Sequence, residues 1–206
     1  MVKKKIDYLL FDLGNVFIYW NKEPFLHTVI DSMPNKNIHS SDYSDPYWID
    51  LITYESDLEK GQLNWNQFCE AIKVKYEWKG CSDALLKSFQ DIFEPNRILI
   101  DWFLRTDFKA STFLVSNTNV YHWRWISKHY ADLLSKFDHL YLSHEVGFRK
   151  PEKEYYLRCL DRSNWCKSLI VDDLKENLEV PRELGADAHH FKDNECLWRH
   201  LDQCAF

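Results

Sequence analysis

The stretch that decides the fold is Tyr8-Leu9-Leu10-Phe11-Asp12-Leu13-Gly14-Asn15-Val16. Four consecutive apolar or aromatic residues are followed abruptly by an acidic residue and, two positions later, by a glycine. A short apolar run that ends in this way is typical of a strand buried on both faces of a parallel sheet. We therefore predict a buried strand over residues 8–11, with Asp12 at its carboxyl end.

The same pattern recurs along the chain. The further apolar runs are 112–115, 140–142, 169–171 and 188–191, and the polar residues that end the first three are Ser116, Ser143 and the pair Asp172-Asp173. Segments with helical spacing separate these runs, and strands that alternate with helices indicate a parallel sheet with right-handed crossovers. We predict an α/β fold with a Rossmann-like parallel sheet. Because ligands bind at the carboxyl ends of such strands, we expect Asp12, Ser116 and Asp173 to meet at one edge.

Residues 20–93 do not follow this alternation. Their stronger apolar spacings are helical, as in Phe68, Ile72 and Tyr76 and in a second series at Leu85, Phe89 and Phe93. We expect a helical cap at 20–93, inserted after the first strand, and a catalytic core made of 1–19 and 94–206. A cap above the strand ends would shield a reaction from water.

Composition narrows the classes of function. The chain has 206 residues and a formal net charge of -6, which disfavours a general affinity for nucleic acid or an anionic membrane. Its six cysteines form no C-x-x-C pair, so we expect free thiols in a reducing cytoplasm. Zinc is unsupported, because the neighbours His189 and His190 would point to opposite faces of a strand.

Four motifs in order resemble those of the haloacid dehalogenase-like hydrolases. They are Asp12-Leu13-Gly14-Asn15-Val16, Ser116-Asn117-Thr118-Asn119, Arg149-Lys150-Pro151 and Asp172-Asp173. Each motif alone has an ordinary explanation, such as a helix cap, a turn or a surface charge. Their spelling most resembles the bacterial branch of the family that includes α-D-glucose-1-phosphate phosphatases.

The resemblance implies a phosphatase that works through an aspartyl-phosphate intermediate, with Asp12 as the nucleophile. Two carboxylates that face an anionic substrate need a cation between them, and Mg²⁺ suits oxygen ligands. Carried over from the family pattern, the Mg²⁺ ligands are Asp12, the backbone carbonyl of Gly14, and Asp173. Ser116 and the amide of Asn117 would bind the phosphoryl oxygens, and Lys150 would stabilise the charge of the transition state.

Two positions depart from this pattern. Most phosphatases of the family carry a second aspartate where this chain has Gly14, and that aspartate protonates the leaving group. The enzyme would then act on substrates with good leaving groups, use a cap residue such as His27 instead, or turn over slowly.

Pro181 is expected to end or kink the helix that follows Asp173, while Pro151 is expected to open the helix after Lys150.

The leading hypothesis is a magnesium-dependent phosphatase of a small phosphorylated metabolite, such as a sugar phosphate. A 2-haloacid dehalogenase also uses an aspartate nucleophile, but it needs no metal. Because Gly14 lacks the acid, a non-catalytic protein that binds a phosphorylated ligand is a further alternative. The sequence indicates neither the substrate nor the oligomeric state.

Overall fold

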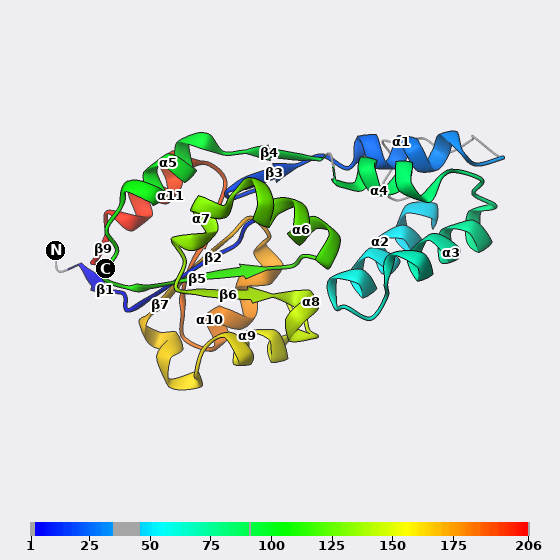
Figure 1. Ribbon diagram of the computed structural model, residues 1–206. Coiled ribbons are helices and arrows are strands. Elements are labelled where there is room, and N and C mark those ends of the chain that lie inside the picture. The colour runs from blue at the N-terminus through cyan, green and yellow to red at the C-terminus, as the bar shows by residue number, and fades with distance from the viewer. Residues whose placement is uncertain (1–2, 35–45, 91, 206) are drawn as a thin grey trace.

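A five-stranded parallel sheet forms the centre of the computed structural model, which describes residues 3–34, 46–90 and 92–205 (Figure 1). The sheet has the order β6-β5-β2-β7-β8. Its strands are β2 (Tyr8–Phe11), β5 (Ser111–Ser116), β6 (His139–Leu142), β7 (Ser168–Asp172) and β8 (Asp187–His190). The predicted α/β fold with a parallel sheet is confirmed.

The path of the chain explains where a site can form. From β2 the chain first builds β5 and β6 on one side, and then returns to build β7 and β8 on the other. This reversal puts a topological switch point beside β2, where a crevice opens at the carboxyl ends of the strands. Phe11 of β2 pairs with Val171 of β7, so Asp12 and Asp172 leave the sheet side by side.

Helices cover both faces of the sheet. One face packs against α5 (Arg97–Arg105), α6 (Val120–His129), α7 (Ala131–Ser135) and α11 (Asn194–Leu201). The other packs against α9 (Lys153–Cys159) and its neighbours α8 (Ser143–Val146), η1 (Arg162–Lys167), η2 (Lys175–Leu178) and α10 (Glu179–Glu183). Leu9 and Phe11 point into the first layer and Leu10 into the second, as the twofold period of a strand requires.

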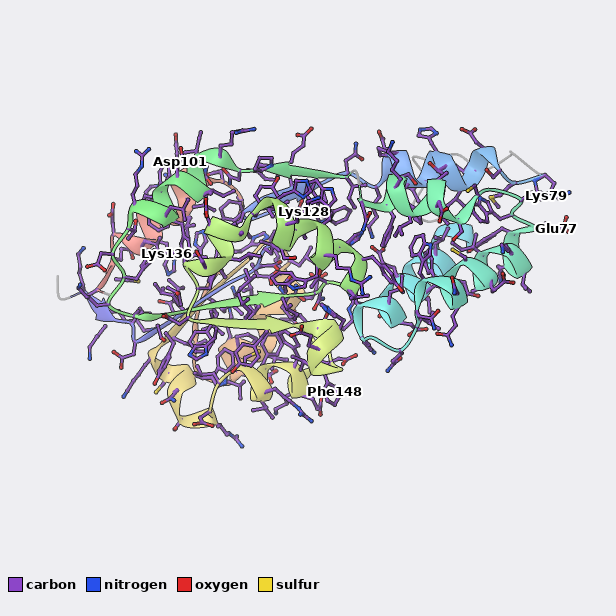
Figure 2. All side chains as sticks on the ribbon, in the orientation of Figure 1. Glu77, Lys79, Asp101, Lys128, Lys136 and Phe148 are labelled. Carbon is purple, nitrogen blue, oxygen red and sulfur yellow. The ribbon has the colours of Figure 1, made fainter. Side chains whose placement is uncertain are left out.

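Four helices form a separate lobe beyond the carboxyl ends of the strands (Figure 1). They are α1 (Glu23–Asp31), α2 (Pro46–Glu59), α3 (Trp65–Tyr76) and α4 (Ser82–Gln90). The lobe has its own apolar core, which includes Phe25, Phe68 and Phe89. The charged residues Glu77 and Lys79 lie at its far end (Figure 2). The division into a core and a cap at residues 20–93 stays a prediction.

A two-stranded ribbon leads into and out of this lobe. Strand β3 (Ile18–Trp20) pairs antiparallel with β4 (Phe93–Pro95). The prediction that Phe93 continues a helix with Leu85 and Phe89 is therefore wrong. Helix α4 ends at Gln90, and Phe93 instead pairs with Trp20. At the other end of the molecule β1 (Lys4–Lys5) pairs with β9 (Cys204–Ala205).

The two prolines behave differently from each other. The prediction that Pro151 opens a helix is wrong, because Pro151 follows a cis peptide bond in a turn and α9 begins at Lys153. Pro181 is the third residue of α10, after the chain has broken from η2. A first-turn N–H needs no acceptor within the helix, so proline is tolerated there. None of the described helices is long and apolar enough to cross a membrane.

Candidate active site

Three carboxylates meet at the carboxyl edge of the sheet. Asp12 follows β2, while Asp172 ends β7 and Asp173 follows it. One carboxylate oxygen of each residue lies within 4.8 Å of the others. Oxygens bound to one Mg²⁺ or Ca²⁺ ion lie about 2.0–2.6 Å from the ion. Asp12 and Asp173, which the sequence placed at one edge, are therefore close enough to share a cation.

Lys150 is the cation at the floor of this site. Its side chain is 1% exposed, and its Nζ lies 2.9 Å from Asp12 Oδ1 and 2.6 Å from Asp172 Oδ2. Burial alone would lower the pKa of Lys150, but the carboxylates of Asp12 and Asp172 outweigh it and raise the pKa above its ordinary value. Lys150 therefore stays positively charged between two acidic groups.

Asp12 is held by contacts on one of its oxygens. Its Oδ1 accepts a hydrogen bond of 2.7 Å from the backbone amide of Leu13 and also pairs with Lys150. These contacts leave Oδ2 for a substrate or a cation. Burial raises the pKa of Asp12 to about 8, with Lys150 opposing the rise and Asp172 adding to it. A bound cation would lower this pKa, because it favours the ionised carboxylate.

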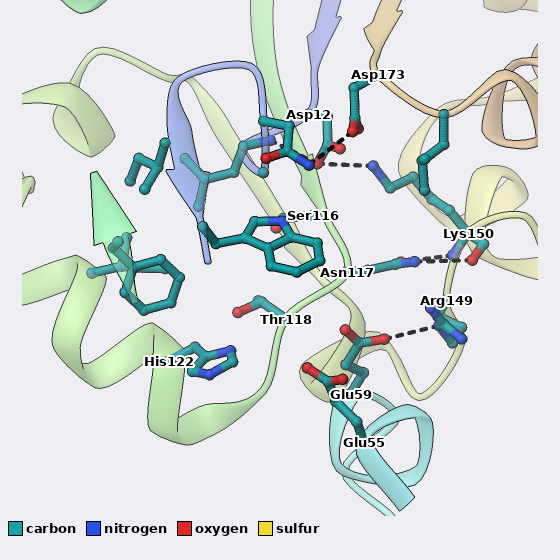
Figure 3. Close-up of a pocket in the computed structure, with 18 of the residues that line it drawn as sticks. Asp12, Glu55, Glu59, Ser116, Asn117, Thr118, His122, Arg149, Lys150 and Asp173 are labelled. Carbon is teal, nitrogen blue, oxygen red and sulfur yellow. Dashed lines mark hydrogen bonds and ion pairs between the residues drawn. The ribbon is translucent and has the colours of Figure 1, made fainter. Parts of the chain in front are cut away.

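The neighbouring aspartates differ in their surroundings. Asp172 is fully buried, and its Oδ1 accepts hydrogen bonds of 2.9 Å from the Leu174 amide and from Asn177 Nδ2. Its Oδ2 pairs with Lys150. Asp173 is half-buried, and its Oδ2 accepts a hydrogen bond of 3.0 Å from Asn15. Asp172 thus orients Lys150, while Asp173 faces the cavity (Figure 3).

The donor set fits a hard divalent cation. Gly14 lines the same cavity as Asp12 and Asp173, and the family resemblance assigns its backbone carbonyl as the third ligand. A local bridge next to this carbonyl runs from the Asn15 amide to the Ile18 carbonyl and from the Ile18 amide to the Leu13 carbonyl. The Gly14 carbonyl takes no part in that bridge. All three groups offer oxygen, which Mg²⁺ and Ca²⁺ prefer over nitrogen or sulfur.

The second motif begins at Ser116, the last residue of β5, and continues into the loop that follows. Ser116 is 2% exposed and lines the cavity. Asn117 makes a double contact with the backbone of Lys150, since its Oδ1 accepts from the Lys150 amide (2.8 Å) and its Nδ2 donates to the Lys150 carbonyl (2.9 Å). The Asn117 side chain therefore positions Lys150, a contact that the sequence did not indicate. Ser143, at the end of β6, supports the same loop through the backbone of Thr118.

A cavity of ≈ 200 Å³ lies above this floor, between the sheet edge and the lobe. Trp20 lines it directly beside Gly14, since a Cβ at position 14 would lie 3.4 Å from the Trp20 indole nitrogen. His27, the candidate substitute for the missing acid, is exposed on α1 and does not line the cavity. His122, which the sequence did not single out, does line it.

His122 is buried and neutral. It accepts from Asn119 Nδ2 at Nδ1 (3.1 Å) and donates from Nε2 to the Phe89 carbonyl (3.0 Å). Burial lowers its pKa to about 4. Asn119 caps α6 by accepting from the amides of Tyr121 and His122. An N-cap residue with a polar side chain three positions later was the sequence signal for this pair.

The wall opposite the sheet comes from α2 (Figure 3). Glu55 forms an ion pair with Lys22, and Glu59 lies 3.0 Å from the Nε of Arg149. Arg149 also donates to Ser56 Oγ at 3.0 Å. Burial raises the pKa of Glu59 to about 7, and Glu55 adds to the rise. Burial would raise the pKa of Glu55 too, but Lys22 lowers it overall.

A second group of metal-ligand side chains lies at the other end of the sheet. Ligand atoms of Asp187, His200 and Cys204 lie within 4.8 Å of one another. Asp187 begins β8, so this group is far from the carboxyl edge. Asp187 already pairs with Lys4 and His200, each at 3.5 Å. Ion pairing accounts for this arrangement.

A doubly wound parallel sheet with a helical lobe inserted after the first long strand and an acidic edge is the fold of the haloacid dehalogenase-like hydrolases. A HAD family enzyme from Bacteroides thetaiotaomicron superposes with a TM-score of 0.77 at 23% identity, over 97% of this chain and 99% of that one. A HAD-like family hydrolase from Porphyromonas gingivalis gives a TM-score of 0.74 at 21% identity, over 96% and 98% of the two chains. These likenesses establish the fold.

More specific relatives carry names that bear on function. The chain is 26% identical to a D-ribitol-5-phosphate phosphatase of Bacteroides thetaiotaomicron over 151 residues, which are 69% of this chain and 73% of that protein. A further structure of the Bacteroides HAD family enzyme, with a TM-score of 0.76 at 24% identity over 94% of this chain and 100% of that one, is a complex with magnesium and inorganic phosphate. No protein-family model matches the chain.

Proposed function

We propose that this chain is a magnesium-dependent phosphatase that hydrolyses a small phosphorylated metabolite, such as a sugar phosphate, through an aspartyl-phosphate intermediate. The observation that carries the proposal is the meeting of Asp12, Asp173 and Lys150 on the floor of a cavity. The magnesium and phosphate bound by the Bacteroides enzyme and the activity named for the curated relative support it.

In the proposed reaction, Asp12 Oδ2 attacks phosphorus while the bond from phosphorus to the leaving-group oxygen breaks, and that oxygen takes its proton from water because Gly14 cannot donate one. Lys150 favours the ionised form of Asp12, which a bound cation would favour further, and its contact with Oδ1 keeps the carboxylate directed into the cavity. The Ser116 hydroxyl and the backbone amide of Asn117 donate to phosphoryl oxygens, on which negative charge is spread in the transition state. Water then attacks the phosphorus of the intermediate, which releases phosphate and restores Asp12.

Asp12, Asp173 and the Gly14 carbonyl would hold the Mg²⁺ ion. When bound, the ion would neutralise negative charge on the phosphoryl group. Asp172 acts on the same chemistry indirectly, because it fixes Lys150 through an ion pair of 2.6 Å.

Gly14 shapes the substrate range. A glycine cannot protonate a leaving group, and general acid–base help is worth about a hundred- to ten-thousand-fold in rate. Substrates whose leaving group departs readily, such as anomeric sugar phosphates including glucose 1-phosphate, suit such a site. D-ribitol 5-phosphate belongs in the same panel because of the relative's activity.

The test is hydrolysis of para-nitrophenyl phosphate, whose leaving group needs no acid. Wild type should release phosphate only with Mg²⁺, and Asp12→Asn should lose at least a hundredfold in rate. Equal rates in both proteins would favour the alternative of a non-catalytic binding protein, which Gly14 keeps open. Halide release from a 2-haloacid without Mg²⁺ would instead indicate a dehalogenase.

A further inference from the structure

The charged residues that line the cavity fall into two groups. The floor consists of Asp12, Asp173 and Lys150, which the proposed function assigns to the phosphoryl group and the cation. The second group consists of Lys22, Glu55, Glu59 and Arg149, and together with the neighbouring Ser56 we call it the α2 wall. The proposed chemistry makes no use of the α2 wall, although its residues face the same space as Asp12 (Figure 3).

The α2 wall carries two positive and two negative side chains. The side chains of Glu55 and Glu59 are 14% and 15% exposed, and those of their partners Lys22 and Arg149 are 22% and 31% exposed. Each positively charged side chain is thus paired with a carboxylate, and both ion pairs are partly buried. Above pH 7, where Glu59 is ionised, the wall has no net charge to offer a ligand.

This balance restricts what can bind there. A second anionic group on the substrate would approach two carboxylates and find both cations already paired, which is unfavourable at low dielectric. Hydroxyl groups suit the wall, because they donate to carboxylates and accept from Lys22 or Arg149. The wall also offers the hydroxyl of Ser56. Thr118, which lines the cavity from the core, has a buried hydroxyl without a hydrogen-bond partner in the described part of the chain.

Trp20 connects the floor to the α2 wall. Its indole lies beside Gly14 at the floor, and the Nζ of Lys22 lies 4.7 Å from the centre of its ring. Lys22 in turn pairs with Glu55. A leaving group that extends from a phosphate at Asp12 towards α2 would pass this ring, and the apolar C–H faces of sugars pack well on aromatic rings.

Resting on the proposed function, we propose that the α2 wall binds the hydroxyl groups of an uncharged leaving group, with Glu55 and Glu59 as acceptors. The substrate is then the monophosphate of a sugar or a sugar alcohol that carries no second charged group. Phosphorylated sugar acids and bisphosphates are excluded by the charge of the wall rather than by its size.

The experiment compares pairs of substrates that differ only at the end remote from phosphate. α-D-glucose 1-phosphate, which has a good leaving group, is paired with α-D-glucuronate 1-phosphate, and D-ribitol 5-phosphate with D-ribonate 5-phosphate. With Mg²⁺ at pH 8, where Glu59 is ionised, wild type should prefer the uncharged alcohol of the better pair by at least tenfold in kcat/KM. Equal kcat/KM for alcohol and acid, or a preference for the acid, would overturn the proposal.

Glu59→Gln and Glu55→Gln test the residues. Each should lower kcat/KM for the sugar alcohol phosphate about tenfold more than for para-nitrophenyl phosphate, since a hydrogen bond to a charged group is lost. Each should also reduce the preference against the acid, because Arg149 or Lys22 is freed to pair with its carboxylate. Glu70→Gln, on the exposed surface of α3, is the matched control and should change neither ratio.

The outcomes separate the two proposals. Equal losses on the sugar alcohol phosphate and on para-nitrophenyl phosphate would show that Glu55 and Glu59 only hold the lobe in place, which overturns the inference. A wild-type protein without Mg²⁺-dependent hydrolysis of para-nitrophenyl phosphate would overturn the proposed function itself, and with it the assignment of a leaving group.

Discussion

Lys150 illustrates how one residue can serve the fold and the proposed chemistry together. It is buried between Asp12 and Asp172, so its charge offsets two carboxylates that burial would otherwise disfavour. From the family motif, the sequence predicted that Lys150 stabilises the charge of the transition state. It did not indicate that Asp172, rather than Asp173, is the second partner, because adjacent aspartates look equivalent until the strand end is seen.

Lys150→Met should therefore destabilise the protein as well as inactivate it. Removing one partner of a buried ion pair typically costs about 3–5 kcal/mol, because the remaining charges are left unpaired. The free energy of unfolding from urea titration measures this loss. Lys73→Met, which removes an exposed lysine paired with Glu70, is the control and should have little effect. A similar small effect for Lys150→Met would contradict the role given to its charge.

His122 gives a prediction for pH dependence. Its pKa is about 4 in the folded chain, below the ordinary value of 6.5, because burial disfavours the charged ring. His122 therefore becomes protonated near pH 6.5 in the unfolded chain, but only near pH 4 in the folded chain. Stability contributed by the neutral ring is complete above pH 6.5 and falls as the pH decreases through this window.

Between pH 7.5 and pH 5 this single group should cost about 2 kcal/mol of unfolding free energy. His122→Gln should flatten the loss by that amount, whatever its effect on stability at pH 7.5. Urea titrations of both proteins at the two pH values provide the measurement. Parallel losses in the two proteins would mean that His122 is protonated in the folded state at pH 5.

At the scale of elements, the strands of the sheet were predictable and the α2 wall was not. The runs at 8–11 and 169–171 read as strands because both of their faces are buried, which leaves a continuous apolar pattern. Their parallel arrangement then brings Asp12 and Asp173 together without further information. Glu59 contacts Arg149 only when the lobe packs against the core. Because the two residues are far apart in the sequence, no local sequence pattern predicts this contact.

Gly61 lies where the lobe docks on the core, just after α2. It has a φ of +68°, and a Cβ there would lie 2.7 Å from the backbone carbonyl oxygen of His144 in α8. Gly61→Ala should combine the cost of a left-handed alanine, about 1–2 kcal/mol, with about 1–3 kcal/mol of overpacking.

Gly147→Ala is a matched control for this prediction. Gly147 has a φ of +79°, but a Cβ there would meet nothing within 4 Å. Urea titration should show that Gly61→Ala is the more destabilising of the two by at least about 1 kcal/mol. Because α2 carries Glu55 and Glu59, Gly61→Ala should also raise KM for the sugar alcohol phosphate. Equal stability losses would show that the backbone near Gly61 and His144 shifts at little cost to accommodate the added methyl group.

For the whole molecule, the cavity joins two bodies that have separate apolar cores. The proposed cation and phosphoryl group touch only residues of the core, whereas the proposed leaving group also touches α2. Ligands of increasing size should therefore protect different parts of the chain from amide hydrogen exchange, which reports local opening.

Asp12→Asn with Mg²⁺ allows this comparison, since slow turnover keeps the ligand intact. Inorganic phosphate should slow exchange at residues 13–15, 116–118 and 173–175, where the floor binds it. D-ribitol 5-phosphate or D-glucitol 6-phosphate should slow exchange there and, in addition, at residues 53–60 of α2 and the turn after it. Protection of α2 by phosphate alone, to the same degree, would mean that closure of the lobe follows from binding at the floor. In that case the α2 wall would not bind the leaving group. The proposed exclusion of substrates with a second charged group would then have no structural basis.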